Sequence, residues 1–191
     1  MVKGMKKAMV AALAAVLTIG SFSTAYAAKS PTGSVEAEKK DDVKADKVNG
    51  IVPTVDTKKD GTATLGSIKK TTKKSVSVPS KVKVNGVEYK VTKISAGAFD
   101  NCTKMKNVTI PSTVTTIGAN AFSGADSLKK ISLSGTKAVS VSKNAFKGTD
   151  TKKMTIEVSP KMSSKELKKL KKELKAAGYK GKVTVKKSTK K

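Results

Sequence analysis

The residues that usually carry enzyme chemistry are scarce in this 191-residue sequence, which has no His and a single Cys, Cys102. His is the commonest general base and metal ligand, so its absence excludes a Ser-His-Asp or Cys-His site and a His-based zinc site. Ser and Lys are abundant, so composition does not exclude a Ser-Lys dyad. No glycine-rich phosphate loop is visible, and the Asp41-Asp42 pair lies in a segment that we expect to be a linker. We therefore expect no catalytic activity, no metal and no cofactor.

Cys102 has two interpretations, a reactive or dimer-forming thiol and a small buried residue. A lone Cys cannot form an internal disulfide even in an oxidising compartment. The residues three positions after Phe99, Phe122 and Phe146 are Cys102, Ala125 and Thr149, which are all small. Free Cys is among the most buried residue types, so this spacing favours the buried interpretation.

The positive charge of the chain is carried by lysine alone, and the net charge is +26. The last 55 residues hold 18 lysines and four acids, a net charge of +14. Such a charge attracts anionic wall polymers, acidic glycans or nucleic acid at low salt, although surface lysines often only solvate a protein. Specific reading of nucleic acid is disfavoured because there is no Arg for bidentate base contacts. The candidate polyanion contacts are Lys168, Lys169, Lys171, Lys172 and Lys175.

The middle of the chain repeats itself, with Phe99, Phe122 and Phe146 spaced by 23 and then 24 residues. The first two units also carry an L-x-x-L-x-L pattern, which is typical of leucine-rich repeats with a period of about 20–29 residues. In the third unit the first Leu-type position is displaced or is filled by Lys153. The predicted repeat core is Ile94, Phe99, Cys102, Val108, Ile110, Ile117, Phe122, Leu128, Ile131, Leu133, Val141 and Phe146.

Both ends of the repeats carry signals of closing elements. Asn85-Gly86 lies between alternating apolar residues and predicts a β-hairpin before the first unit. Ser163 and Glu166 spell a capping box, and apolar residues at helical spacing run from there to Gly178. Residues 182–185 then alternate like a strand. The sequence predicts a mostly-β, α+β solenoid of about three repeats with a hairpin cap and a helix-strand cap.

The residues between the buried strand positions are the candidate ligand contacts. In a leucine-rich solenoid these side chains face outward in a row, where they either bind a protein or glycan or only solvate the strand. The candidates are Asn107, Thr109, Lys130, Ser132, Thr155 and Glu157.

The N-terminus has the features of a secretory signal peptide. Lysines precede an apolar run, and Ala25-Tyr26-Ala27 is an A-x-A cleavage site. A membrane anchor is the alternative, but the run is shorter than the ~20 residues that an anchor needs. No second apolar stretch follows, so we expect no transmembrane segment after cleavage and a secreted or cell-surface protein. We assign residues 1–27 to the signal, 28–61 to a flexible charged linker, 62–160 to the repeat domain and 161–191 to the capping helix, strand and basic tail.

The run VTKISAGAFDNCTKMKNVTIPSTVTTIGANAF resembles the BspA-type leucine-rich repeat, also called the treponemal type, of bacterial surface proteins. The resemblance covers roughly residues 76–160, with departures at Ala125 in place of Cys and Gly135 near the place of Pro. It implies a secreted or surface-displayed solenoid that binds other macromolecules, often described as an adhesin, and it implies no catalytic residues. The expected partner is an unidentified protein or glycan, and the alternative is an electrostatic binder of anionic wall polymers or acidic glycans.

Overall fold

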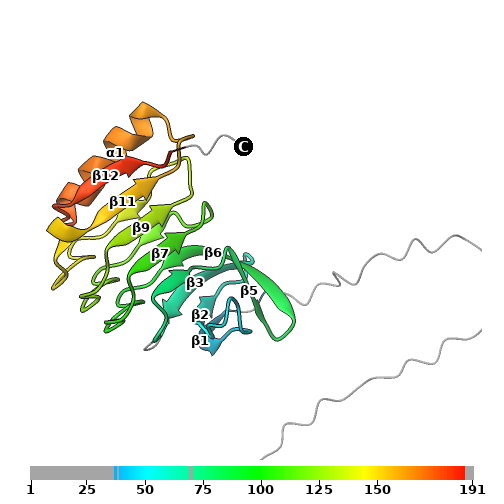
Figure 1. Cartoon of the computed structure of the whole chain (residues 1–191). Coiled ribbons are helices and arrows are strands. Elements are labelled where there is room, and N and C mark those ends of the chain that lie inside the picture. The colour runs from blue at the N-terminus through cyan, green and yellow to red at the C-terminus, as the bar shows by residue number, and fades with distance from the viewer. Residues whose placement is uncertain (1–36, 38, 69–70, 188–191) are drawn as a thin grey trace, which may run out of the picture. The chain divides into compact units, whose positions relative to one another are not determined.

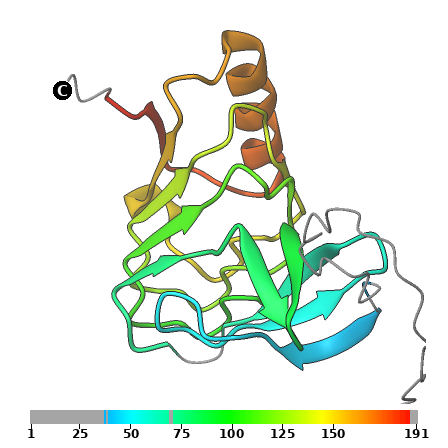
Figure 2. The same cartoon turned by 90° about the vertical axis from the view of Figure 1, so that its right-hand side faces the viewer.

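The computed structural model describes residues 37, 39–68 and 71–187. Within these residues the chain is mostly β, with one α-helix, α1 (Ser164–Ala176), and one short 3-10 helix, η1 (Thr151–Lys153). The helix and the antiparallel strands of the N-terminal part lie at opposite ends of the described unit (Figures 1 and 2). The expected mostly-β class with a single helix is confirmed.

The segment expected to be a flexible linker holds two strands, β1 (Lys40–Lys44) and β2 (Thr54–Thr57). They continue antiparallel into β3 (Thr62–Ser67). The linker interpretation is therefore wrong for residues 40–57. The high charge of this segment hides an alternation in which Val55 and Thr57 are buried, and such alternation lets a polar strand bury one face. The expected signal peptide, residues 1–27, lies outside the described residues.

Between residues 75 and 158 the chain passes back and forth between two sheets. The first sheet continues with β6 (Val87–Ile94), β8 (Thr116–Ile117) and β10 (Ser140–Val141), which are parallel. The second sheet holds β4 (Ser75–Ser77), β7 (Asn107–Ile110), β9 (Lys130–Leu133), β11 (Thr155–Val158) and β12 (Lys182–Val185). These five strands are also parallel, and four of them are labelled side by side in Figure 1.

The predicted hairpin is present, with β5 (Lys81–Val84) pairing antiparallel to the start of β6. Asn85 and Gly86 at its tip have φ of 52° and 82°. Positive φ at both positions is what a two-residue type I′ hairpin turn requires, and Asn-Gly is the pair that adopts it at least cost.

A column of aromatic rings runs through the core. The ring centroids of Phe99 and Phe122 lie 5.0 Å apart and those of Phe122 and Phe146 lie 5.6 Å apart, with nearly parallel planes. Tyr179, which the sequence did not place in the column, continues it at 5.4 Å from Phe146. The structure buries all twelve predicted core residues, none of which is more than 6% exposed.

The third repeat keeps a buried Leu-type residue, but this residue lies one position later in the sequence. Lys153 is exposed, whereas Met154 is 1% exposed. The 3-10 turn of η1 precedes Met154 and shifts the buried side chain by one residue. Of the two possibilities that the sequence left open, displacement is the one observed.

Helix α1 begins where the capping box places it and ends before Gly178, which has φ of 86°. The Ser163 hydroxyl accepts a hydrogen bond from the Glu166 amide at 3.3 Å. The Glu166 carboxylate does not complete the box, because it accepts instead from the amide of Ala138, 28 residues away, at 2.7 Å. The helix is thus tied to the preceding coil of the chain.

Candidate binding surface

The row of candidate contacts exists as the strand alternation predicted. Across β7, β9 and β11, Asn107 lies in register with Lys130, and Lys130 with Thr155. The second set, Thr109, Ser132 and Glu157, is in register in the same way. Each residue follows or precedes a buried neighbour and is itself exposed or half-buried. The six side chains therefore form two adjacent ladders on one sheet face.

The ladders extend beyond the six residues predicted from the sequence. Strand β4 adds Ser75 and Ser77, which are in register with Asn107 and Thr109. Strand β12 adds Lys182 and Thr184 at the other end of the sheet. Two signals could have revealed these four residues, namely the match between VSVPSKV and VTIPSTV and the alternation of Lys182–Val185.

Neighbouring rungs of the ladders are linked by hydrogen bonds. The Asn107 side-chain amide donates to the Ser75 hydroxyl at 3.1 Å. The Ser132 hydroxyl donates to Glu157 at 3.3 Å, and the Lys130 ammonium lies 3.6 Å from the same carboxylate. An ion pair this exposed contributes less than about 1 kcal/mol, so its main effect is to orient the side chains.

A turn within the segment predicted to be a linker overhangs this face. Val48 and Ile51 exchange backbone hydrogen bonds of 2.8 and 2.9 Å around Asn49 and Gly50, whose φ values are both positive. The Lys73 ammonium donates to the Asn49 carbonyl at 2.6 Å and holds the turn. The signal for it was present, since Val-Asn-Gly-Ile has the same pattern as the Val-Asn-Gly-Val of the predicted hairpin.

The overhanging turn and the ladders enclose a polar hollow of about 400 Å³. Its lining offers hydroxyl, amide and ammonium groups and two apolar side chains, which suits a polar ligand held by hydrogen bonds. The lining residues are Asn49, Ile51, Ser75, Val76, Ser77, Asn107, Thr109, Lys130 and Ser132. Thr109 lies centrally, because it also lines two adjoining hollows of about 500 and 400 Å³.

The candidate polyanion contacts occupy a different place. All five lysines, Lys168, Lys169, Lys171, Lys172 and Lys175, are exposed on α1. The opposite side of the helix buries Leu170 and Leu174. The lysines are therefore exposed along the terminal helix and do not line the polar hollow.

The acidic residues and the cysteine in the described part of the chain do not gather into a metal site. No group of three or more His, Cys, Asp or Glu side chains forms a potential metal site there. Cys102 is fully buried, its thiol donates to the Ile68 carbonyl at 3.3 Å, and burial raises its pKa. A raised pKa disfavours the reactive thiolate, so the buried, structural interpretation of Cys102 is the one observed.

Among the described residues, no helix has the length and apolarity that crossing a membrane requires. Helix α1 has 13 residues and carries charge along its whole length.

Comparison with known proteins places the chain among leucine-rich repeat proteins. A solved leucine-rich repeat protein from Bacteroides capillosus is 23% identical, with a TM-score of 0.54 and coverage of 76% of this chain and 100% of that one. A leucine-rich cell surface protein from Faecalibacterium prausnitzii is 25% identical with a TM-score of 0.48, and this chain spans 33% of its length and is itself 62% covered. No curated protein matches significantly. The family model of the BspA-type leucine-rich repeat region (6 copies) matches residues 70–174, more than half of the sequence. The chain therefore belongs to the BspA-type leucine-rich repeat family.

Proposed function

We propose that this protein is a non-catalytic binding module displayed on or outside the cell, which contacts a protein or glycan through the polar ladders of its second sheet. In this proposal the chain is a short solenoid of about three repeats, with the antiparallel strands β1–β3 at one end and α1 and β12 at the other; the hairpin β5–β6, expected from the sequence as the cap, instead branches from within the first sheet. Membership of the BspA-type family supports a binding role. The predicted signal at residues 1–27 supports export.

The observation that carries this proposal is the register of the five parallel strands. It aligns ten outward side chains, most of them neutral and polar, in two continuous ladders. A row that only solvated its strands would need no concave shape, yet here the turn at residues 48–51 adds a wall and creates the hollow. Concave polar surfaces with convergent donors and acceptors are the usual form of a ligand site.

The test of this proposal is to block the hollow at its centre. Thr109→Arg places a long charged side chain where three hollows meet. The matched control is Thr116→Arg, at an outward position of β8 in the first sheet. Binding of both variants to a glycan array and to immobilised extracellular proteins is compared with that of the unsubstituted protein.

We expect Thr109→Arg to abolish any ligand signal and Thr116→Arg to retain it, with both variants melting near the unsubstituted protein because surface substitutions shift stability by only about 0.5 kcal/mol. Equal binding by the two variants would show that the ladders do not contact the ligand.

The alternative role, electrostatic binding of anionic wall polymers, is supported only by the exposed lysines of α1. A salt titration separates the two roles. Binding held by charge weakens steeply as salt rises, because screening shortens the Debye length to about 3 Å at 1 M. Binding in the polar hollow is expected to change little over the same range.

A further inference from the structure

The two sheets end differently at the C-terminal end of the chain. The last strand of the first sheet is β10, and Glu173 of α1 accepts a hydrogen bond from its Val141 amide at 3.3 Å. The last strand of the second sheet is β12, which pairs with β11 on one side only among the described strands. Helix α1 thus supplies hydrogen-bond partners to one sheet edge and none to the other.

The backbone groups on the unpaired side of β12 are those of two valines. The amides of Lys182 and Lys186 donate to Met154 and Val158 of the β11 segment at 3.1 and 2.9 Å. In a parallel ladder alternate residues direct both backbone groups to the same side, so Val183 and Val185 direct theirs away from β11. This strand therefore presents donors and acceptors in the pattern that an added strand would use.

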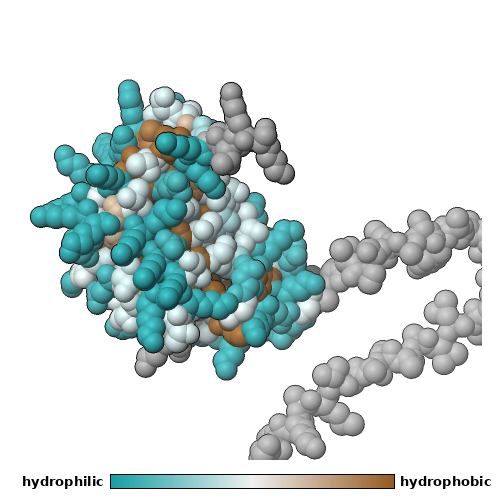
Figure 3. Space-filling view, viewed as in Figure 1, coloured by the Kyte–Doolittle hydropathy of each residue, from teal (hydrophilic) through white to brown (hydrophobic). Residues whose placement is uncertain are grey.

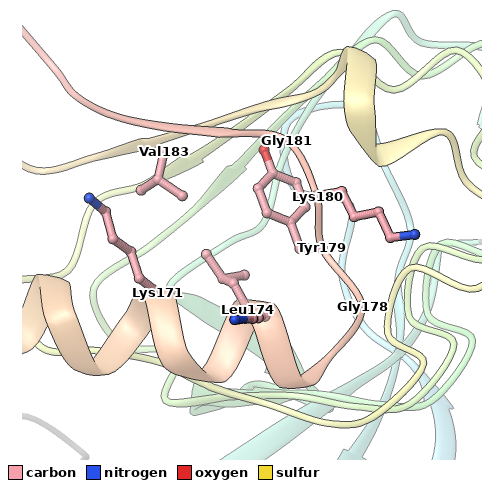
Figure 4. Close-up of a pocket in the computed structure, with 8 residues that line it drawn as sticks. Lys171, Leu174, Gly178, Tyr179, Lys180, Gly181 and Val183 are labelled. Carbon is pink, nitrogen blue, oxygen red and sulfur yellow. The ribbon is translucent and has the colours of Figure 1, made fainter.

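An apolar groove lies beside this edge, between β12 and α1. It has a volume of about 650 Å³, and its apolar lining comes from Leu174, Tyr179 and Val183. Lys171 and Leu174 project from the helix toward Val183 (Figure 4). Val185, on the same face of the strand as Val183, is 51% exposed. Alternate side chains of an added strand would enter this groove and cover both valines.

The surroundings of the groove are uniformly cationic. The groove is lined by three lysines, Lys171, Lys175 and Lys180, and its lining contains no carboxylate. The Lys180 side chain is directed away from Val183 in Figure 4. On the outer face of β12, Lys182 and Lys186 alternate with the valines and are exposed. Hydrophilic side chains surround apolar patches over the face in Figure 3. A second copy of this end would bring lysine against lysine, so the charge disfavours self-association here.

We infer that the open edge of β12 is a docking site for an extended acidic segment of a partner protein, which adds a sixth strand to the second sheet. The segment has alternating apolar and acidic residues. Its apolar side chains lie in the groove over Leu174 and Val183, and its acidic side chains lie beside Lys182 and Lys186. Backbone hydrogen bonds give affinity in this mode, and the alternating side chains give selectivity.

Lysine on an edge strand has a second effect that is compatible with docking. Charged side chains on an open edge oppose edge-to-edge aggregation of like molecules. The same lysines repel basic and self-derived strands while they attract an acidic one, so the selectivity arises partly from repulsion.

The test uses the full, unsubstituted protein and a labelled peptide, Glu-Val-Glu-Val-Glu-Val-Glu, with blocked ends. Binding is followed by fluorescence anisotropy and by hydrogen exchange of the Val183 and Val185 amides. Two control peptides have the same charge: one has Pro in place of each Val, which removes the amides that a strand added antiparallel to β12 would donate to Val183 and Val185, and the other is oligo-aspartate. We expect the alternating peptide to bind at least about tenfold more tightly than either control and to slow exchange at both valines.

Two variants complete the test. Val185→Pro removes an outward amide and should lower affinity for the alternating peptide by about tenfold while leaving oligo-aspartate binding unchanged. Lys186→Gln should weaken binding more than Lys104→Gln, an exposed lysine of an earlier loop. Equal binding of the alternating and Pro-containing peptides, or unaltered exchange at Val183 and Val185, would overturn the inference and leave only attraction by charge.

Discussion

The two edge strands at the C-terminal end, β10 and β12, lie beside the same helix, but only β10 has hydrogen-bond partners on it. Strand β10 and the loop before it receive carboxylates from α1, through Glu173 to Val141 and Glu166 to Ala138. Strand β12 is flanked by lysines of the helix and of its own segment. Carboxylates accept hydrogen bonds from free amides, whereas ammonium groups cannot. The sign of the nearby charge therefore decides which edge is closed.

The few acidic residues near the C-terminus support this difference. Residues 137–191 contain four acids, and each has a local partner. Asp150 accepts from the Lys152 amide, Glu157 pairs with Lys130, and Glu166 and Glu173 bond the preceding coil. Because all four carboxylates already have partners, none of them pairs with the lysines beside β12. The positive charge at this end therefore favours an acidic partner over self-association.

Truncation of the aromatic column should destabilise both edge strands, because the column supports the core beneath them. Phe122 stacks between Phe99 and Phe146 and is fully buried. We expect Phe122→Ala to lower the free energy of unfolding by about 3–5 kcal/mol, as truncation of core aromatic residues does. Chemical denaturation measures it, and hydrogen exchange should show β10 and β12 losing protection together. An unchanged unfolding midpoint would refute the stacked column.

A smaller change should open only the first edge. Glu166→Ala removes the 2.7 Å hydrogen bond to the Ala138 amide, a partly buried bond to a charged group. Such bonds contribute about 1.5–3 kcal/mol, so we expect a loss of that size in unfolding experiments. Lys165→Ala, at the exposed neighbouring position of the helix, is the control and should change stability by less than about 0.5 kcal/mol. Equal effects of the two variants would mean that the carboxylate does not hold the loop.

These glutamates also show where inference from sequence ends. The columns of Ile, Phe and small residues follow from a spacing of 23 or 24 residues, and the helix follows from its cap and periodicity. Partners that lie 28 and 32 residues away, as for Glu166 and Glu173, have no local signature. The pattern S-x-x-E predicted a reciprocal cap, but tertiary contact with the preceding coil gave the carboxylate a different amide.

The binding face was partly predictable for a related reason. Strand alternation fixes which residues point outward, so the ladders follow once the repeats are aligned. The wall formed by the turn at residues 48–51 does not follow, since it depends on how an N-terminal segment folds back over the sheet. The high charge of residues 28–61 favoured a linker, and it concealed both the Asn-Gly turn and the apolar alternation beside it.

Tyr179 lies next to the start of β12 and should make stability depend on pH. Its ring packs against Phe146, its hydroxyl lies 2.9 Å from the carbonyls of Met154 and Lys182, and burial raises its pKa to about 12. The unfolded chain ionises this tyrosine near pH 10, whereas the folded chain keeps it neutral to about pH 12. The neutral group thus favours folding below pH 10, and this contribution is lost as pH rises from 10 to 12.

The control for this titration is Tyr179→Phe, which keeps the ring and removes the ionisable hydroxyl. The difference in unfolding free energy between the two proteins should fall steadily from pH 10 to 12, while contributions from other groups cancel. A difference that stays constant across this range would mean that the hydroxyl is not held in the buried, hydrogen-bonded form.

Proline substitutions in β12 should have small and unequal effects on stability. Proline is tolerated on an edge strand only where the missing amide would face solvent. We therefore expect Val185→Pro to cost less than about 1 kcal/mol, because the Val185 amide points away from β11. Thr184→Pro, one residue earlier, removes an amide that points toward β11 and should cost more. Chemical denaturation measures the loss of unfolding free energy in both variants. Equal losses would mean that the edge is not open, whereas a larger loss for Thr184→Pro assigns the free hydrogen-bonding groups to the valines.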